Sequence, residues 1–205
     1  MPGEYGFCTI DVRGGDIVSR MFIAIRFTPV HRHLLKETAE QSRSFVTHGK
    51  YVPHDLYHLT VQFLGEMKAG EAELVRNELA QCAEIFPPFE LEFDRMGYFE
   101  KRNKAILWIG IRNHQALIEL HEEVHQRISK LGFADERSFR PHITIARQVA
   151  FNDERSKENL IKKPINIQSF CVDQIDLMES IRLDDHLTYR SIKAYKLTGE
   201  KGFYS

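Results

Sequence analysis

The sequence is poor in cysteine, in long apolar runs and in net charge, and each shortage excludes a class of protein. Its three cysteines, Cys8, Cys82 and Cys171, are an odd number with no C-x-x-C spacing, which excludes a disulfide framework and a zinc ribbon. No apolar run approaches the ~20 residues of a membrane helix, and the N-terminus lacks the basic segment of a secretory signal. We therefore expect a cytoplasmic protein.

The formal net charge of −1 lacks the broad basic face with which a protein coats long nucleic-acid duplexes. A small nucleotide or an RNA end needs only a few local cations and stays possible as a ligand. The short basic runs at 101–104 and 162–163 are typical of solvated loops. With 205 residues, 42% of them apolar and 28% charged, the chain has the composition of an ordinary globular protein. Its length suits one large domain or two lobes that share a core.

One short pattern, His-apolar-Thr-apolar, occurs twice. The chain reads Y-H-L-T-V-Q-F-L-G from Tyr57 and R-P-H-I-T-I-A-R from Arg140, which puts the two histidines 84 positions apart (142 − 58 = 84). Both segments are rich in β-branched and apolar residues and have the length of strands. Each histidine alone is more often a structural residue of a strand, and two of them at matching places in a repeat favour a shared function.

The repeat extends beyond the two motifs. The same offset of 84 carries the apolar run Phe22–Phe27 onto Ile106–Ile111, and each run is followed by a helix pattern, a His-x-Thr strand and another helix pattern. We expect an α+β fold made by internal duplication, with two antiparallel sheets, helices on their outer faces and a central cleft between the His-x-Thr strands. The expected segments are an extension at 1–20, then one domain at 21–205 with lobes near 21–97 and 104–200.

Several further elements are expected from periodicity and from helix start and stop signals. Helices are expected at about 28–45, 71–86, 113–131 and 153–162, and strands at 89–93, near 165–180 and at 188–197.

Alternation along a strand places every second side chain on the same face. Each motif strand therefore has one face that packs on helices and one face with an imidazole beside a hydroxyl. The expected cleft face carries His58, Thr60 and Gln62 in the first copy and His142, Thr144 and Ala146 in the second, and the expected core face carries Leu59, Val61, Phe63, Ile143 and Ile145.

Two imidazoles and two hydroxyls around one cleft are suited to phosphodiester hydrolysis without a metal. A neutral histidine takes a proton from the attacking water, and a protonated one gives a proton to the leaving oxygen. Threonine hydroxyls donate to the non-bridging phosphate oxygens, and an arginine neutralises the charge that accumulates there. The alternative is that both histidines are structural.

The motifs occur within a longer series of segments: M-F-I-A-I from Met21, H-L-T-V-Q-F-L-G-E, R-M-G-Y-F before A-I-L-W-I-G-I, F-R-P-H-I-T-I-A-R and a final Y-R-S-I-K-A-Y-K-L ending at Leu197. In these the chain resembles the 2H phosphoesterases, and within them the bacterial RNA 2′,3′-cyclic phosphodiesterases, also called 2′-5′ RNA ligases. The resemblance implies a bilobal fold, no metal or cofactor, and hydrolysis of a 2′,3′-cyclic phosphate to a 2′-phosphomonoester.

The family's pattern also assigns roles. It makes His58 the proton donor and His142 the proton acceptor, and it makes Thr60, Thr144 and Arg147 the residues that bind phosphate. The implied partners are RNA ends or small cyclic nucleotides; we expect a monomer and infer no protein partner.

Two points stay open in this interpretation. Strict alternation puts Arg147 on the core side and Arg140 on the cleft side, so either arginine is a candidate for the phosphate contact. Residues 1–20 lie outside the resemblance, and are either an extension or the product of a start codon assigned too early, with Met21 the first native residue.

A rival motif, H-E-E-V-H at 121–125, matches the H-E-x-x-H pattern of zinc hydrolases. Its two histidines lie at the edge of the apolar stripe of a helix and no third ligand follows, so a solvated helix face is the preferred interpretation. A third possibility is a protein that binds nucleotides or RNA ends without turnover. Tyr98, Phe99 and Trp108 could then stack on a base, although each suits core packing equally well.

Overall fold

The computed structural model describes residues 11–13, 16–102, 104–112, 115–133, 137–183 and 186–200, which form an α+β fold. The helices are α1 (Pro29–Gln41), α2 (Ala69–Ile85), α3 (Gln115–Lys130) and α4 (Glu154–Lys162), with 3₁₀ turns at Ser42–Phe45 and His54–Leu56. The strands are β1 (Asp11–Arg13), β2 (Asp16–Arg26), β3 (Val46–Tyr51), β4 (His58–Lys68), β5 (Phe89–Leu91), β6 (Phe93–Lys101), β7 (Lys104–Ile111), β8 (His142–Phe151), β9 (Phe170–Val172), β10 (Gln174–Leu183) and β11 (His186–Lys196).

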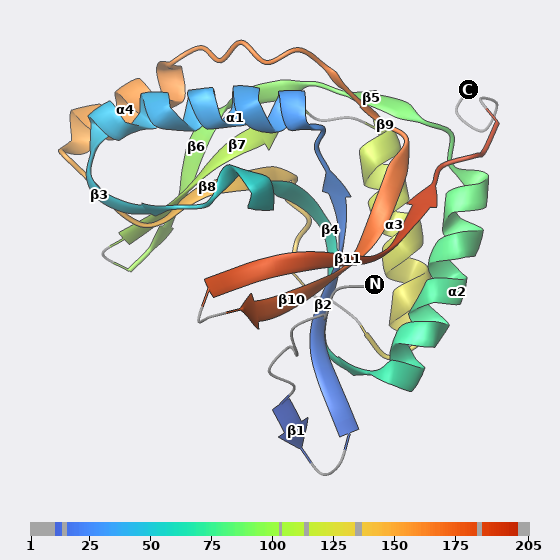
Figure 1. Ribbon diagram of the computed structural model, residues 1–205. Coiled ribbons are helices and arrows are strands. Elements are labelled where there is room, and N and C mark those ends of the chain that lie inside the picture. The colour runs from blue at the N-terminus through green and yellow to red at the C-terminus, as the bar shows by residue number, and fades with distance from the viewer. Residues whose placement is uncertain are drawn as a thin grey trace, which may run out of the picture.

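Two antiparallel sheets hold the two motif strands. In the first sheet β2 lies between β4 and β10, β11 follows β10, and β1 pairs with the start of β2. The second sheet has the order β3-β8-β7-β6, and β5 and β9 form a separate short pair. The first motif opens β4 and the second opens β8, so each sheet contributes one His-x-Thr strand (Figure 1).

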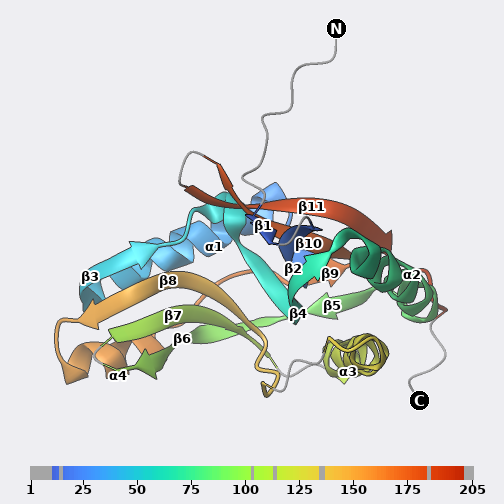
Figure 2. The same ribbon diagram turned by 90° about the horizontal axis from the view of Figure 1, so that it is seen from below.

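The lobes interleave along the chain. Helix α3, which follows β7 of the second sheet, packs beside α2 and against β4 of the first sheet. Helix α1, which follows β2 of the first sheet, lies over the second sheet next to α4 (Figures 1 and 2). The first sheet joins β2 and β4 to β10 and β11, and the second joins β3 to β8. The sheets therefore do not follow the expected division at 21–97 and 104–200, because each takes strands from both stretches.

The register of the sheets shows the duplication directly. In the first sheet His58 lies opposite Arg26 and Thr60 opposite Ala24. In the second sheet the residues opposite the motif are Gly110 for His142 and Trp108 for Thr144. Each residue of the second set lies 84 positions after its counterpart in the first, as the sequence predicts.

All four expected helices are present, with small shifts at their ends. Helix α1 starts where expected, because the Thr28 side chain accepts a hydrogen bond from the His31 amide and Pro29 occupies the first turn. Helix α3 buries the predicted stripe that includes Leu117, Leu120 and Val124. In the described part of the chain no helix is both long enough and apolar enough to cross a membrane. Asn113, the expected cap of α3, is outside the described residues.

Three expectations about strands and termini were wrong. Strand β3 was not predicted, and β6 runs on to Lys101 where a loop was expected from residue 100. Residues 16–20, assigned to an extension beyond the fold, form the first half of β2, and Val18–Arg20 pair with Glu66–Lys68 of β4. They were missed because this polar stretch has no alternating apolar pattern.

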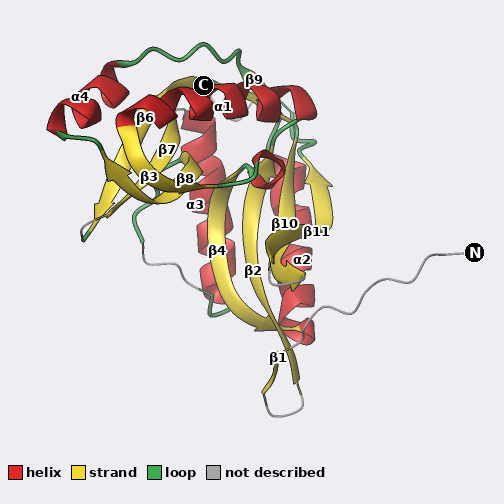
Figure 3. Cartoon of the chain, turned by 60° about the vertical axis from the view of Figure 1, so that its left-hand side comes forward, coloured by secondary structure: helices red, strands yellow, loops and turns green. Residues whose placement is uncertain are grey.

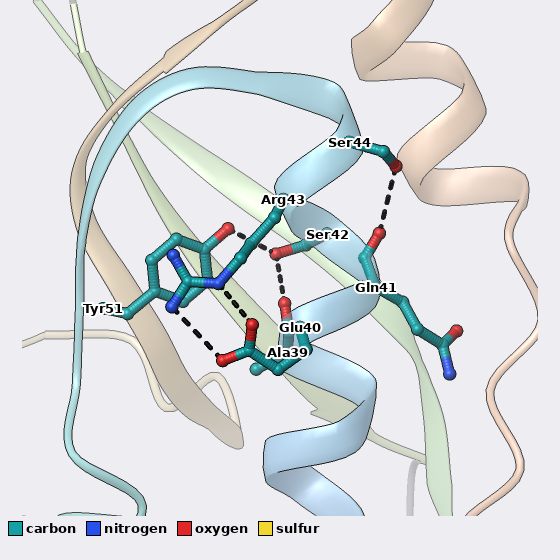
Figure 4. A network of polar contacts seen from close by, with 7 residues as sticks. All are labelled: Ala39, Glu40, Gln41, Ser42, Arg43, Ser44 and Tyr51. Carbon is teal, nitrogen blue, oxygen red and sulfur yellow. Dashed lines mark hydrogen bonds and ion pairs between the residues drawn. The ribbon is translucent and has the colours of Figure 1, made fainter.

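A polar network joins the end of α1 to β3 (Figure 4). The Ser42 hydroxyl donates to the carbonyl of Ala39 at 2.6 Å and lies 2.8 Å from the hydroxyl of Tyr51. The Arg43 guanidinium lies 3.9 Å above the Tyr51 ring and pairs with Glu40. Tyr51 thus fixes the end of β3 to the helix, which explains how a strand with little apolar character is held at the edge of the sheet.

Glycine makes room for the one tryptophan of the chain. Gly97 on β6 lies directly opposite Trp108 on β7, and a Cβ atom at Gly97 would lie 2.3 Å from Cη2 of the indole. A Cβ atom at Gly110 would lie 3.0 Å from Cζ3 of the same ring. The indole therefore lies flat on the sheet, on the face that carries Thr144, and only a residue without a side chain fits beneath it.

Replacing Gly97 with alanine should therefore destabilise the fold by about 1–3 kcal/mol, the usual cost of overpacking. It should also move the emission spectrum of Trp108, which is the sole tryptophan. Chemical unfolding followed by fluorescence measures both effects. Gly70→Ala is the matched control, because a Cβ atom at Gly70 would have no other atom within 4 Å and alanine is favoured in a helix. Equal stability of the two variants would contradict this account of the packing.

Candidate active site

The two motif strands meet where the sheets meet. Strand β4 lies at the edge of the first sheet, next to β8 of the second (Figure 3). His58, Thr60, His142 and Thr144 are all half-buried. The imidazoles of His58 and His142 are close enough that a positive charge on His142 lowers the pKa of His58. The expected cleft with two histidines is therefore present.

Each motif contains a β-bulge directly after its threonine. In β4 the register passes from Thr60 opposite Ala24 to Gln62 opposite Ile23, which leaves Val61 as the extra residue. In β8 it passes from Thr144 opposite Trp108 to Ala146 opposite Leu107, which leaves Ile145 as the extra residue. The bulges thus fall at equivalent positions of the repeat. A bulge inserts one residue and so reverses the facing of every side chain that follows it.

The bulges correct three of the expected facings. Gln62 and Ala146, expected in the cleft, are 1% and 0% exposed and lie on the core side. Phe63, expected in the core, is 42% exposed and pairs with Phe22 on the cleft side. Strict alternation was the wrong assumption for these residues, because it holds only for a strand without a bulge. Leu59, Val61, Ile143 and Ile145 are buried as expected.

The same correction removes the difficulty with Arg147. It follows Ala146, which faces the core, so its side chain has the cleft facing that strict alternation denied it. Its positive charge lowers the pKa of both His58 and His142, so the guanidinium lies near enough to act on both imidazoles. Arg140 is also exposed beside the cleft, and its backbone carbonyl is used by His142.

Both imidazoles are oriented in the same way. Nδ1 of His58 lies 2.8 Å from the carbonyl oxygen of Leu56, and Nδ1 of His142 lies 2.6 Å from that of Arg140. A carbonyl oxygen can only accept, so Nδ1 carries the hydrogen and donates it in both residues. Nε2 of each ring is then the nitrogen that can take up or release a proton.

Aromatic rings enclose both histidines. The ring of His58 lies 5.0 Å from those of Phe22 and Tyr189, measured between ring centres. The ring of His142 meets the edge of Phe99 at 5.0 Å. Of the aromatic residues considered for base stacking, Tyr98 and Phe99 line the cavity, and Trp108, which lies flat on Gly97, packs beside Phe99 with 5.3 Å between ring centres. These rings cover part of each imidazole, which is half-buried.

The environment lowers the pKa of both imidazoles. Burial is the main cause for His58, the hydrogen bond to Leu56 opposes it, and the charges of Arg147 and His142 add to the lowering. For His142 burial again dominates, the bond to Arg140 opposes it, and Arg147 adds to the lowering. Protonation of either imidazole therefore favours the unfolded chain. The free energy of unfolding should fall as the pH drops below the ordinary imidazole value of ~6.5.

A second arginine, Arg26, lies opposite His58 on the neighbouring strand. Its guanidinium is 3.6 Å from the carboxylate of Asp176, which is fully buried and also accepts a hydrogen bond of 2.6 Å from Ser191. Half of the arginine side chain stays exposed. Sequence reasoning missed Arg26, although it shares the facing of Phe22 and Ala24 along β2 and could have been found from that.

A cavity of about 550 Å³ opens between the two motifs. Thr60 and His142 form part of its wall, together with Phe63, Phe99 and Phe139. The guanidinium of Arg137 lies 4.2 Å above the Phe63 ring at its border. The cavity therefore joins the reactive side chains to a largely aromatic surface, which is the usual character of a site for a small organic ligand.

The H-E-x-x-H motif has a different environment from a zinc site. The rings of His121 and His125 are stacked with their centres 5.9 Å apart, and Nδ1 of His121 lies 2.9 Å from the carbonyl oxygen of Val61. Glu122 points to solvent. Within the residues that the structure describes, no three histidine, cysteine, aspartate or glutamate side chains lie together as metal ligands would.

Sequence reasoning missed the two aromatic residues around His58. Phe22 was assigned only to an apolar strand and Tyr189 only to the final strand. Tyr189 has a raised pKa because it is buried, an effect that the nearby charges of Arg147 and Arg20 reduce. Its position follows from the pairing of β11 with β10 and of β10 with β2. Pairing between segments so far apart in the chain leaves no local signal.

Comparison with known proteins gives a family and several relatives. The model of the 2′-5′ RNA ligase superfamily matches residues 32–183. An RNA 2′,3′-cyclic phosphodiesterase of Geobacillus stearothermophilus is 30% identical over 183 residues, which is 88% of this chain and 58% of that protein. One of Thermotoga maritima is 30% identical over 167 residues, covering 78% of this chain and 86% of that protein. The chain therefore spans little more than half of the first relative.

Solved structures share the fold. Escherichia coli LigT in complex with 3′-AMP superposes with a TM-score of 0.73 and 24% identity, over 88% of this chain and 98% of that one. A protein of Thermus thermophilus superposes with a TM-score of 0.75 and 23% identity, over 88% of this chain and 99% of that one.

Arg147→Gln should raise the pKa of both His58 and His142, because it removes a positive charge that opposes their protonation. NMR titration of the imidazole Cε1–H signals measures the two values. Arg140→Gln is the control, since it keeps the backbone carbonyl that His142 uses, and it should leave the His142 titration almost unchanged. A rise in only one of the two histidines would show that Arg147 does not act on both imidazoles.

Proposed function

Because this chain belongs to the 2′-5′ RNA ligase superfamily, we propose that its cleft hydrolyses 2′,3′-cyclic phosphates at RNA ends or on small nucleotides, and yields 2′-phosphomonoesters. The observation that supports this most is the mirrored orientation of two imidazoles. Each donates from Nδ1 to a carbonyl two residues before it, at equivalent places in a duplicated fold. The two histidines also lie on the strands that meet at the junction of the sheets, where a shared role in one reaction accounts for both.

The proposed reaction uses one imidazole in each protonation state. His142, neutral, takes a proton at Nε2 from the water that attacks phosphorus. His58, protonated, gives its Nε2 proton to the 3′ oxygen as the bond between phosphorus and that oxygen breaks. The 2′ oxygen stays bonded to phosphorus, so the product is a 2′-phosphomonoester. Attack by the 5′-hydroxyl of another RNA in place of water would give a 2′-5′ linkage by the same proton transfers.

The remaining groups of the cleft would stabilise the phosphate. The hydroxyls of Thr60 and Thr144 share a face with the imidazole of their own motif and would donate to the non-bridging oxygens. The guanidinium of Arg147 would balance the negative charge that grows there in the transition state. These groups supply proton transfer and charge stabilisation, so the reaction needs neither a metal nor a cofactor.

The relatives and neighbours support a nucleotide as the ligand. The curated relatives are named RNA 2′,3′-cyclic phosphodiesterases, and Escherichia coli LigT has been crystallised with 3′-AMP and with ATP. In this chain the aromatic cavity beside Thr60 and His142 would accept a base. We propose that the protein acts as a monomer in the cytoplasm. A protein that binds RNA ends without turnover is the second candidate.

Turnover of a 2′,3′-cyclic nucleotide and of an RNA with a 2′,3′-cyclic phosphate end, both in EDTA, tests the proposal. We expect full activity in the chelator, and His58→Ala and His142→Ala should each lower kcat by at least about 10². The double variant should lose far less than the product of the two single losses, because both groups act in one transition state. Activity that EDTA abolishes and zinc restores would defeat the proposal, and binding without turnover would leave the second candidate.

The pH dependence tests the assignment of acid and base. The profile of kcat/KM should be a bell, with its maximum on the acid side of ~6.5, because both imidazoles have lowered pKa values in the unliganded protein. A bound phosphate is negative and raises both values, so the bell for kcat should lie at higher pH. His58→Ala should remove the alkaline limb and His142→Ala the acid limb. The opposite result would exchange the two roles.

A further inference from the structure

We propose that His121, the first histidine of the H-E-x-x-H segment, is a positioning residue that holds the two catalytic motifs in register with each other. This rests on the proposed function of the cleft. The imidazole of His121 projects from α3 into the region where the motifs meet and contacts the segments that carry both of them. Its role would be to fix the distance between groups that must act on the same phosphate.

The first contact is a hydrogen bond to the bulge of the first motif. Nδ1 of His121 lies 2.9 Å from the carbonyl oxygen of Val61, and this nitrogen is the donor because a carbonyl only accepts. Val61 is the extra residue of the bulge and has no partner opposite it on β2. Strand β4 is also at the edge of its sheet. The imidazole therefore holds the bulge in place from the side that no strand covers.

The second contact is a stack on the segment that enters the second motif. The rings of His121 and Phe139 are almost parallel, with 9° between their planes and 3.9 Å between their centres. Phe139 precedes His142 by three residues, and the Arg140 carbonyl that orients His142 follows directly after it. A shift of Phe139 would therefore reach the atom that fixes the His142 ring.

His121 thus contacts both sides of the cleft. Through Val61 it acts on Thr60, and through Phe139 it acts on His142, and all four residues border the same cavity. Catalysis depends on such distances, since a displacement of ~1 Å can cost about 10²-fold in rate. Because His121 has no place in the proton transfers, its loss should affect kcat far more than KM.

The rest of the H-E-x-x-H segment provides the controls. His125 lies one turn further along α3, where Nε2 is 3.5 Å from the Ser129 hydroxyl. Unlike His121, it is not part of the cavity wall. Glu122 is exposed. The ring of His125 is stacked with that of His121, with 5.9 Å between their centres, so His125→Phe keeps a ring at this position and removes only its nitrogen atoms.

The experiment compares His121→Phe, His121→Asn and His125→Phe. Phenylalanine keeps a ring for the stack and removes the donor, whereas the asparagine amide places a donor near the position of Nδ1. With 2′,3′-cyclic AMP as substrate, kcat of His121→Phe should fall about 10- to 100-fold with KM changed by less than about threefold. His121→Asn restores the donor without the ring and should recover part of the loss, and His125→Phe should match the wild type. Thermal unfolding of each variant shows whether a loss of activity is only a loss of folded protein.

A second measurement observes the hydrogen bond without using activity. Val61-Gln62 is the only Val-Gln pair in the sequence, so labelling valine carbonyls with ¹³C and glutamine with ¹⁵N gives one NMR correlation that belongs to this bulge. The Val61 carbonyl signal should move in His121→Phe and return towards the wild-type position in His121→Asn.

The outcomes separate the two proposals. Full kcat in His121→Phe, or an equal loss in His125→Phe, would overturn the role of His121 and leave the function of the cleft intact. Failure of His121→Asn to recover either kcat or the carbonyl signal would also overturn it. A wild-type protein without turnover would instead overturn the proposed function, and the positioning role with it, whatever the carbonyl signal does.

Discussion

The bulge after each threonine is the constraint on which the cleft depends. A regular strand would place the histidine, the threonine and the residue two positions after the threonine (Gln62 or Ala146) on one face. It would also send Arg147 into the core. One extra residue, Val61 in β4 and Ile145 in β8, keeps a continuous apolar face before and after the bulge. It also turns Arg147 towards the imidazoles. Polar residues at unequal spacing can thus share one face without a charge entering the core.

The cleft combines partial burial of the imidazoles with a fixed orientation of their rings. Phe22, Tyr189 and Phe99 surround the imidazoles, and two backbone carbonyls hold their tautomers. The same burial disfavours the charged imidazole that an acid catalyst needs. An anionic ligand offsets this disadvantage, because its charge favours protonation of the ring beside it. The unliganded cleft is accordingly arranged for a ligand that brings negative charge with it.

The repeat, the fold class and the identity of the facing residues before each bulge could be predicted from the sequence, because they follow from local alternation and from one repeated spacing. The facing of the side chains after each bulge could not be predicted, because no sequence pattern marks the extra residue. That residue reverses the facing of Gln62, Phe63 and Arg147. The partners of His58 were equally hidden. Phe22 reaches it through the pairing of β2 with β4, and Tyr189 through β11, β10 and β2, which pair across most of the chain. The assigned roles of His58, His142, Thr60, Thr144 and Arg147 stay predictions.

The interleaving of the two lobes also governs the order in which the chain can fold during synthesis. Strand β2 emerges early, yet it is an inner strand whose second neighbour, β10, starts at Gln174. Until that residue has left the ribosome, β2 has one open edge, and the apolar face of α2 lacks the contacts that β10 and β11 provide. Nascent chains of intermediate length therefore expose a strand edge and an apolar surface, the features that chaperones recognise and that promote aggregation. The second sheet has all of its strands once Phe151 has emerged, whereas the first sheet waits for β10 and β11 near the end of the chain.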